Sequence, residues 1–407
     1  MKSNRLKGLL YFLLIAAAAG AAAAPGGDSA PRVLNGIDVL RRQNFAPLAQ
    51  KRVGLVTNHT GLAADGATTI DLLFKCGVCR LVALFSPEHG IRGVVDQRVE
   101  SAVDETTGLP IHSLYGETLR PRPDMLRGLD ALVFDIQDVG ARFYTYPTTM
   151  AYCMEEAARA GIPFYVLDRP NPIGGVSVEG PILDADKTSF VGYMPLPVRH
   201  GMTLGELARY FNSENRIGAD LHVVEMEGWR RGHYFSDTGQ LWVNPSPNMR
   251  SLLEAIFYPG VCLLEGANVS VGRGTDRPFE IVGAPWIEPR RLAAALRESA
   301  VPGVEFVPVV FTPASSNYRG QQCGGVNLIL TDRSRFNSVQ AGLSLMSALR
   351  QLYGEQFGID KTVRLLGSEQ VLTALKKAEP LPEVMRLAGA GMGDFMEKRR
   401  KALIYQQ

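Results

Sequence analysis

The sequence has 407 residues, of which 46% are apolar and 21% charged, a composition typical of a globular protein of two or three domains. Its 43 basic and 41 acidic residues give a formal charge of +2, and no basic run is interleaved with aromatic residues. Binding to nucleic acid or to a membrane surface through charge is therefore not expected. A small molecule or the end of a polymer is the expected partner.

The first residues are typical of a secretory signal. Lys2, Arg5 and Lys7 precede an apolar run over 9–19, and small residues continue to Ala24. The apolar run is shorter than the ~20 residues that a membrane span requires. We therefore expect a signal peptide over 1–24, its cleavage, export to the periplasm, and no stable membrane insertion afterwards. An uncleaved anchor is the alternative, because Pro25 lies beside the expected cut.

Five cysteines lie beyond this signal, and two of them, Cys76 and Cys79, form a C-x-x-C motif. No second pair occurs at the spacing of a zinc site, so no metal is expected there. The motif predicts either a local disulfide or two buried thiols.

The first half of the chain alternates buried strands with helices. Apolar runs predict strands over 52–57, 81–85, 130–136 and 163–167, and the segments between them predict helices over 36–50, 69–75 and 149–160. The polar segment 93–123 lacks periodicity and is expected to be a long loop. The alternation predicts parallel βαβ units, and hence an α/β, Rossmann-like, doubly wound and mostly parallel sheet.

The second half has a different pattern. Thr203, followed three residues later by Glu206, predicts a capped helix over 203–212, and the apolar run 261–265 predicts a further strand. Beyond these we expect helices over 290–298, 339–353 and 368–377, and strands over 305–311 and 326–330. We therefore expect a Rossmann-like catalytic domain over 25–286 and a smaller α+β domain over 287–407.

Glu88 and His89 are the first candidates for catalysis. They follow the strand 81–85 and Pro87, which ends it, and Gly90 allows the chain to turn. An acid and an imidazole are thereby expected at the carboxyl end of a central strand, where open α/β sheets bind ligands. The alternative is a Glu that caps the next helix and a His in an ordinary turn.

Polar residues also follow the other predicted strands. The candidates at these ends are Asn58, Asp135, Asp138, Arg142, Tyr144, Asp168 and Asn171, with Glu179 and Arg273 further along the chain. The carboxylates are suited to general acid/base catalysis. Tyr144 could stack on a sugar ring, and an arginine binds a carboxylate in bidentate fashion. The alternatives are a turn-capping role for Asp135 and ion pairs of the arginines with Asp135, Asp138 or Glu265.

Several familiar motifs are missing from the sequence. It contains no G-x-x-x-x-G-K-[ST], no G-x-G-x-x-G after a strand, no G-x-S-x-G and no H-E-x-x-H. A nucleotide fingerprint, an α/β-hydrolase triad and a zinc-protease motif are thus unsupported, and no cofactor is expected.

Seven segments together resemble one known family, the exo-acting β-N-acetylmuramidases of the NamZ type. They are G-L-V-T-N-H-T-G (54–61), L-F-S-P-E-H-G (84–90), F-D-I-Q-D-V-G-A-R-F-Y-T-Y (134–146), L-D-R-P-N-P (167–172), V-E-G-P (178–181), N-P-S-P-N-M (244–249) and L-E-G-A-N-V-S-V-G-R-G-T (264–275). The resemblance extends over about residues 33–405.

The resemblance implies a Rossmann-like domain, an ancillary C-terminal domain, and release of N-acetylmuramic acid from the non-reducing ends of peptidoglycan fragments. It also implies that Glu88 is the catalytic acid/base and that Glu265, Asn268 and Arg273 belong to the substrate site. Asp135, Asp138 and Glu179 stay open as the second catalytic group, as does the sugar's own 2-acetamido group.

Two other functions remain as alternatives. Asp135 and Asp138 after a strand are similar to the paired aspartates of Mg²⁺-dependent phosphatases, which would require the metal. A two-lobed, non-catalytic protein that binds sugars or muropeptides in the periplasm is the other alternative, and it would bind without turnover.

Overall fold

The computed structural model describes residues 33–92 and 100–406. The predicted signal over 1–24 lies outside the described residues. Within the described part of the chain, no helix is both long enough and apolar enough to cross a membrane.

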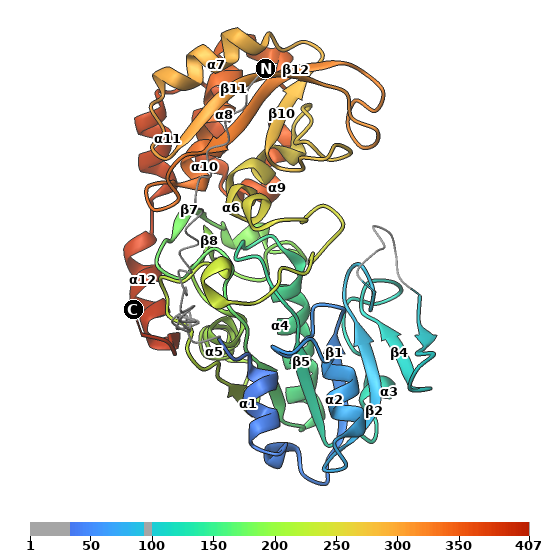
Figure 1. Ribbon diagram of the computed structural model, residues 1–407. Coiled ribbons are helices and arrows are strands. Elements are labelled where there is room, and N and C mark those ends of the chain that lie inside the picture. Colours follow the sequence, from blue (N-terminus) through green and yellow to red (C-terminus); the bar gives the residue numbers. More distant parts are fainter. Residues whose placement is uncertain (1–32, 93–99, 407) are drawn as a thin grey trace, which may run out of the picture. The chain divides into compact units, whose positions relative to one another are not determined.

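A seven-stranded sheet forms the centre of the first half of the chain (Figure 1). Its strands stand in the order β3-β4-β2-β1-β5-β6-β9, and every pairing is parallel except that of β3 with β4. Their bounds are β1 (Arg52–Thr57), β2 (Arg80–Ser86), β3 (Ala102–Val103), β4 (Pro110–Ser113), β5 (Ala131–Asp135), β6 (Phe164–Leu167) and β9 (Leu221–Val224). The predicted doubly wound, mostly parallel sheet is confirmed.

Helices cover both faces of this sheet. They are α1 (Gly36–Arg42), α2 (Thr69–Lys75), α3 (Pro123–Leu126), α4 (Thr145–Ala160) and α5 (Leu204–Glu214). Leu40 of α1 and Leu73 of α2 share one buried cluster with Leu55 of β1. Phe134 of β5 and Phe211 of α5 belong to the larger cluster on the opposite face. The sheet is therefore buried on both sides, as its near-continuous apolar strands require.

The strand order places a switch point between β1 and β5. From β1 the chain passes through α2 to β2 and β4 on one side, and then returns to β5 on the other side of β1. The loops that leave β1 and β5 consequently run in opposite directions. Such a divergence opens a crevice at the carboxyl ends of the two strands.

A smaller antiparallel sheet, of order β10-β12-β11, lies in the second half of the chain (Figure 1). Its strands are β10 (Ile281–Ala284), β11 (Val304–Phe311) and β12 (Cys323–Leu330). The helices of this half are α6 (Leu252–Val261), α7 (Pro289–Glu298), α8 (Ser338–Tyr353), α9 (Val363–Leu366), α10 (Glu369–Lys376), α11 (Leu381–Ala388) and α12 (Met392–Ala402). A short hairpin pairs β7 (Glu179–Ile182) with β8 (Pro197–Arg199).

Helix α6 crosses α8 at two glycines. A Cβ atom added at Gly260 would lie 1.8 Å from the carbonyl oxygen of Ser338, and one added at Gly342 would lie 2.3 Å from that of Gly260. The close approach therefore requires glycine at both positions. It fixes the end of α6, which leads directly into the candidate site.

The end of the chain packs against the edge of the first sheet. The Tyr405 hydroxyl donates to Asp168 Oδ2 at 2.7 Å, and the Ile404 amide donates to Glu206 Oε1 at 2.9 Å. The Arg231 amide also donates to the carbonyl oxygen of Gln406 at 3.2 Å. The C-terminal residues thus complete the hydrogen bonding of a strand end and a helix N-terminus that are distant in sequence.

Three sequence-based expectations are wrong in part. The run 261–265 is not a strand. A capping box of Ser251 and Glu254 begins the buried helix α6, which extends to Val261, and a 3-10 helix over Cys262–Gly266 continues it. The helix predicted over 36–50 ends at Arg42, since Asn44 and Phe45 have positive φ. The segment 93–123 contains β3 and β4, and its residues 93–99 lie outside the described part.

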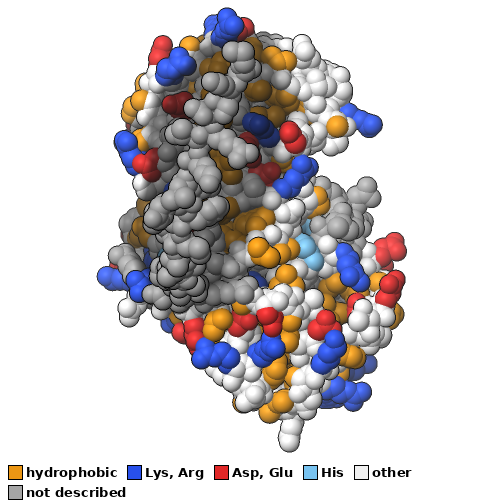
Figure 2. Space-filling view, in the orientation of Figure 1, with side chains coloured by type: hydrophobic (Ala, Val, Ile, Leu, Met, Phe, Trp, Pro, Cys, Tyr) orange, Lys and Arg blue, Asp and Glu red, His pale blue; other side chains and the backbone are white. Residues whose placement is uncertain are grey.

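Other expectations agree with the structure. The capping box of Thr203 and Glu206 is present at the start of α5. Cys76 and Cys79 are thiols with their sulfur atoms 3.5 Å apart, and both are half-buried. On the face shown in Figure 2, Lys and Arg side chains are interspersed with Asp and Glu.

Candidate active site

A cavity of about 480 Å³ opens beside the carboxyl end of β2. Its lining comes from the turn after β2, the segment before α4, the turn 246–249, the end of α6, the 3-10 helix that follows it, and the loops around 273 and 315. Five of the residues predicted from the sequence line it, namely Glu88, His89, Tyr144, Glu265 and Arg273. Residues from both halves of the chain therefore meet in one cavity.

Glu88 is held by the first residue of α4. The Thr145 hydroxyl donates to Glu88 Oε2 at 2.6 Å, and the side chain of Glu88 lines the cavity. Within the described part of the chain, no hydrogen bond engages the other carboxyl oxygen, Oε1. The carboxyl is thus oriented through one oxygen, while the other remains available for proton transfer.

His89 adopts an uncommon backbone conformation. Its φ is 70°, in the left-handed region, and Gly90 follows with a φ of 74°. A non-glycine residue in this region is uncommon and concentrates at functional sites. The turn directs both Glu88 and His89 to the cavity.

Aromatic rings form one wall of the cavity. Tyr258 makes edge-to-face contacts with Phe143, Tyr144 and Phe279, at centroid distances of 5.3, 5.9 and 4.8 Å. Burial raises the pKa of Tyr144 and of Tyr258, so both phenols are neutral at physiological pH. This wall is suited to the apolar face of a sugar ring.

An ion pair contributes charge to the same cavity. Arg273 Nη1 lies 3.2 Å from Glu265 Oε1, and both side chains are partly exposed. The alternative that Arg273 pairs with Glu265 is therefore realised. Both side chains also belong to the lining of the cavity, so a ligand bound there would contact the pair.

Asp135 and Asp138 do not line this cavity. Asp135 is fully buried in an ion pair with Arg169, whose Nη2 lies 3.0 Å from Asp135 Oδ2, and it also accepts from the Thr69 hydroxyl. Asp138 accepts from the Gly140 amide at 2.8 Å. Burial raises the pKa of Asp138 to about 7. Both carboxyls follow β5 as expected, but they point into the protein.

Arg142 also lies away from the cavity. It is 2% exposed, and its guanidinium donates to the backbone carbonyls of Pro181, Leu196, Leu365 and Leu366. These carbonyls belong to segments far apart in the sequence. Arg142 therefore joins backbone segments, and its guanidinium is not placed to bind a ligand carboxylate in the cavity. Among the described residues, the alternative ion pair of Arg142 with Asp135, Asp138 or Glu265 is not formed either.

The remaining predicted residues have protein partners outside the cavity. Asp168 accepts from Thr203, Gly205 and Tyr405, and Glu179 pairs with Arg199 and accepts from the Val339 amide. Asn58 bonds Tyr146 and Thr60, Asn171 bonds Met202 and Ile173, and Asn268 bonds Gln356 and Gly358. These five side chains fix the loops around the site.

Several residues that line the cavity were not predicted from the sequence. They include Phe143, Thr145, Ser246, Tyr258, Cys262 and Phe279. Cys262 lies in the run 261–265 that was predicted to be a strand, and Tyr258 lies just before it, in α6. The pairing of Ser251 with Glu254 is the signal that could have revealed the helix that carries Tyr258.

Models of one protein family match nearly the whole of the described chain. The model of the N-terminal part of the exo-β-N-acetylmuramidase NamZ matches residues 53–253, and that of its C-terminal part matches residues 256–405. The chain belongs to the NamZ family of exo-β-N-acetylmuramidases. The predicted family resemblance is confirmed.

Relatives of this family cover nearly all of the chain. The peptidoglycan β-N-acetylmuramidase NamZ of Bacillus subtilis (strain 168) is 45% identical over 380 residues, which are 92% of each protein. Two DUF1343 family proteins of Bacteroides fragilis NCTC 9343 have solved structures similar to this one. The first has a TM-score of 0.87 at 36% identity and the second 0.76 at 32%, and each match covers 92% of this chain and 99% of the other.

Proposed function

We propose that this chain is an exo-acting glycosidase that releases N-acetylmuramic acid from the non-reducing ends of peptidoglycan fragments. Membership of the family makes the chain a glycosidase, and the Bacillus subtilis relative is a peptidoglycan β-N-acetylmuramidase. The observation that carries the proposal is the Glu88 carboxyl, oriented by Thr145 at an aromatic-walled cavity. We also propose that the protein is exported, on the basis of residues 1–24.

Glu88 is the general acid/base in this proposal. Glycosidic cleavage requires a carboxyl that protonates the leaving oxygen and later accepts a proton from water. Among the carboxyls predicted from the sequence, only Glu88 and Glu265 lie in the cavity lining that the structure describes. Asp135, Asp138 and Glu179 are instead engaged by protein groups.

The second group in this proposal is the 2-acetamido group of the substrate. Glu265 is the other carboxyl of the cavity, and Arg273 pairs with it. We assign this pair to recognition, in which Arg273 binds the lactyl carboxylate of the muramic acid. An acetamido nucleophile predicts retention of the anomeric configuration, whereas a water activated by Glu265 predicts inversion. NMR of the initial product distinguishes the two.

Turnover of a chromogenic β-N-acetylmuramide, with the matching glucosaminide alongside and EDTA present, tests the proposal. We expect selective cleavage of the muramide by the wild type, and a ~10²–10⁴-fold loss of kcat in Glu88→Gln. Glu117→Gln is the matched control, since the Glu117 side chain is 92% exposed, and it should retain full activity.

Each alternative predicts a different result in this assay. Full activity of Glu88→Gln would refute the role of that residue. Binding of the muramide without turnover by the wild type would favour a binding protein. The phosphatase alternative would require Mg²⁺ and a free Asp135, which is instead bound to Arg169.

A further inference from the structure

A second cavity, of about 240 Å³, lies at the switch point of the large sheet. Its lining comes from the loop after β1, from Gln137 after β5, from Arg169 after β6, and from the segment 235–243. Open α/β sheets bind ligands at this crevice. The active-site cavity, by contrast, lies beside β2 and shares no lining residue with it.

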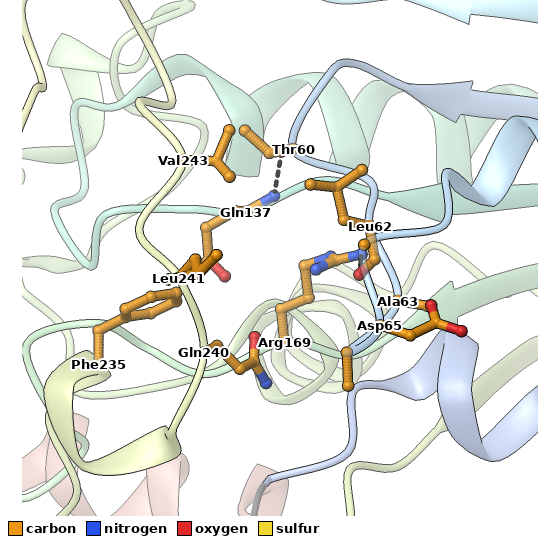
Figure 3. Close-up of a pocket in the computed structure, with 12 residues that line it drawn as sticks. Thr60, Leu62, Ala63, Asp65, Gln137, Arg169, Phe235, Gln240, Leu241 and Val243 are labelled. Atoms are coloured by element: carbon orange, nitrogen blue, oxygen red, sulfur yellow. Dashed lines mark hydrogen bonds between the residues drawn. The ribbon is translucent and has the colours of Figure 1, made fainter.

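Apolar side chains form the walls of this cavity (Figure 3). Figure 3 shows Phe235, Leu241 and Val243 on one side and Leu62 and Ala63 on the other. Leu241 is 85% exposed, an unusual position for a large apolar side chain beside a cavity. The volume corresponds to roughly eight waters at about 30 Å³ each, which suits a small aliphatic group.

Two buried polar side chains face this cavity, and in each of them one polar atom has no hydrogen-bond partner among the described residues. Gln137 is 5% exposed, and its Nε2 donates to the carbonyls of Asp138 and Pro170, at 2.8 Å each, so its orientation is fixed. Arg169 is 4% exposed and uses Nε and Nη2 on Asp135 and the Leu62 carbonyl. No group among residues 33–92 and 100–406 bonds Gln137 Oε1 or Arg169 Nη1.

The two remaining atoms are accessible from the cavity. Both side chains line the cavity, and neither Gln137 Oε1 nor Arg169 Nη1 is shielded from solvent. The cavity therefore offers one acceptor, Oε1, and one donor, Nη1, on rigid supports. An accessible polar atom of this kind hydrogen-bonds water until a ligand with a matching group replaces that water.

Charge at the cavity is balanced. Arg169 is neutralised by Asp135, and Asp65, at the rim, is paired with Arg41 at 2.7 Å. A charged ligand therefore gains little from the site. An uncharged group that both accepts and donates a hydrogen bond matches it best, and the secondary amide is the common group of this kind.

We propose that this cavity is a second binding site, for an uncharged aliphatic amide such as a short peptide of alanine-sized residues. The amide carbonyl accepts from Arg169 Nη1, its N–H donates to Gln137 Oε1, and small side chains pack on Leu62, Leu241 and Val243. An N-acetylated sugar carries the same amide, but the apolar walls favour the peptide. The inference does not depend on the role of Glu88.

Methyl NMR of the full chain with labelled Leu and Val residues tests this site directly. The probe is N-acetyl-L-alanine N-methylamide, for which we expect a Kd of about 1 mM and shifts at Leu62, Leu241 and Val243. Leu365, which lines the active-site cavity, reports separately on binding there. A fully N-methylated analogue, which lacks N–H groups, and N-acetylglucosamine are titrated in parallel.

Substitutions at exposed positions test the contact of the probe with Leu241, because they leave the buried core unchanged. Leu241→Asp should weaken binding of the probe at least about fivefold, because it places a charge on an apolar wall. Val310→Asp is the matched control, since Val310 is 59% exposed on β11, and it should bind as the wild type does.

The possible results separate the alternatives. Shifts with the N–H probe that are lost with the N-methylated analogue and weakened in Leu241→Asp would support the site. Unmoved methyls at saturating probe, or equal binding of the two amides, would overturn it. Stronger binding of N-acetylglucosamine at the same methyls would overturn the peptide assignment. Because the readout is binding, a failure of the proposed glycosidase activity would leave these results unaffected.

Discussion

At the scale of single residues, the direction in which each side chain points decides which candidates share the active-site cavity. The sequence correctly predicted that Glu88 and Asp135 lie at strand ends, because turn-forming residues end the apolar runs. Their directions did not follow from the sequence, since these depend on partners such as Thr145 and Arg169, which are distant in sequence. Glu88 consequently lines the cavity, whereas Asp135 is buried in an ion pair.

Thr145 is a positioning residue for Glu88 in the proposed mechanism. Thr145→Val removes the hydroxyl that bonds Glu88 Oε2, and we expect kcat to fall about tenfold with little change in KM. Thr145→Ser keeps the hydroxyl and should restore most of kcat. Steady-state kinetics of the two variants measure kcat and KM separately. Equal losses in both variants would indicate a packing effect.

Asp138 makes stability depend on pH. Burial raises its pKa from 3.8 to about 7, so between these pH values the unfolded chain ionises while the folded protein retains the proton. The free energy of unfolding therefore falls as pH rises from about 4 to about 7. Asp138→Asn removes this decline, and its stability relative to wild type should grow by up to about 4 kcal/mol across that range.

Urea unfolding at a series of pH values measures the difference between Asp138→Asn and wild type. Asp186→Asn is the control, because the Asp186 side chain is 73% exposed, and it should parallel the wild type throughout. A difference that stays constant with pH would show that Asp138 ionises normally in the folded protein.

At the scale of elements, long buried strands follow from the sequence and short edge strands do not. β1, β2, β5 and β6 are continuous apolar runs, and their predicted bounds agree with the structure within one or two residues. β3 and β9 lie at the edges of the sheet and are short or half-exposed, so their composition resembles that of loops. The apolar run 261–265 joins the end of α6 to the 3-10 helix that follows it, and its length and composition do not distinguish a short helical segment from a strand.

The ion pair of Asp135 and Arg169 joins the ends of β5 and β6, and Thr69 adds the start of α2 to it. Asp135→Asn leaves the buried Arg169 without a counter-charge and should lower the free energy of unfolding by about 3–5 kcal/mol. Asp65→Asn breaks the exposed pair with Arg41 and should cost about 1 kcal/mol or less. Denaturant unfolding compares them, and equal costs would contradict the buried role.

At the scale of the whole molecule, two arginines that appear equivalent in the sequence serve different purposes. Both stand in family motifs, and both were candidates for binding a carboxylate. Arg142 is buried among four backbone carbonyls from both halves of the chain. Arg273 lies in the active-site cavity. Long-range packing of this kind leaves no local signal in the sequence.

The paired substitutions Arg142→Met and Arg273→Met separate these roles. Arg142→Met should destabilise the protein by about 3 kcal/mol or more, because several buried carbonyls lose their donor. Arg273→Met should leave the melting temperature unchanged and raise KM for the muramide about 10–100-fold, with little effect on a glucosaminide. Arg364→Met, at an exposed position, is the control. A fall in melting temperature for Arg273→Met would contradict its assignment to binding.

The packing of residues 404–406 against the first sheet also bears on when the protein can fold. Asp168 and Glu206 are buried in the first half of the chain, yet some of their hydrogen-bond donors, at 404 and 405, lie far downstream in the sequence. Domains generally fold as they emerge, from the N-terminus onward. Here the strand end at Asp168 and the helix start at Glu206 complete their hydrogen bonding only once residues 404 and 405 have been made and have docked. We therefore expect the first half of the chain to gain stability late, when those residues join it.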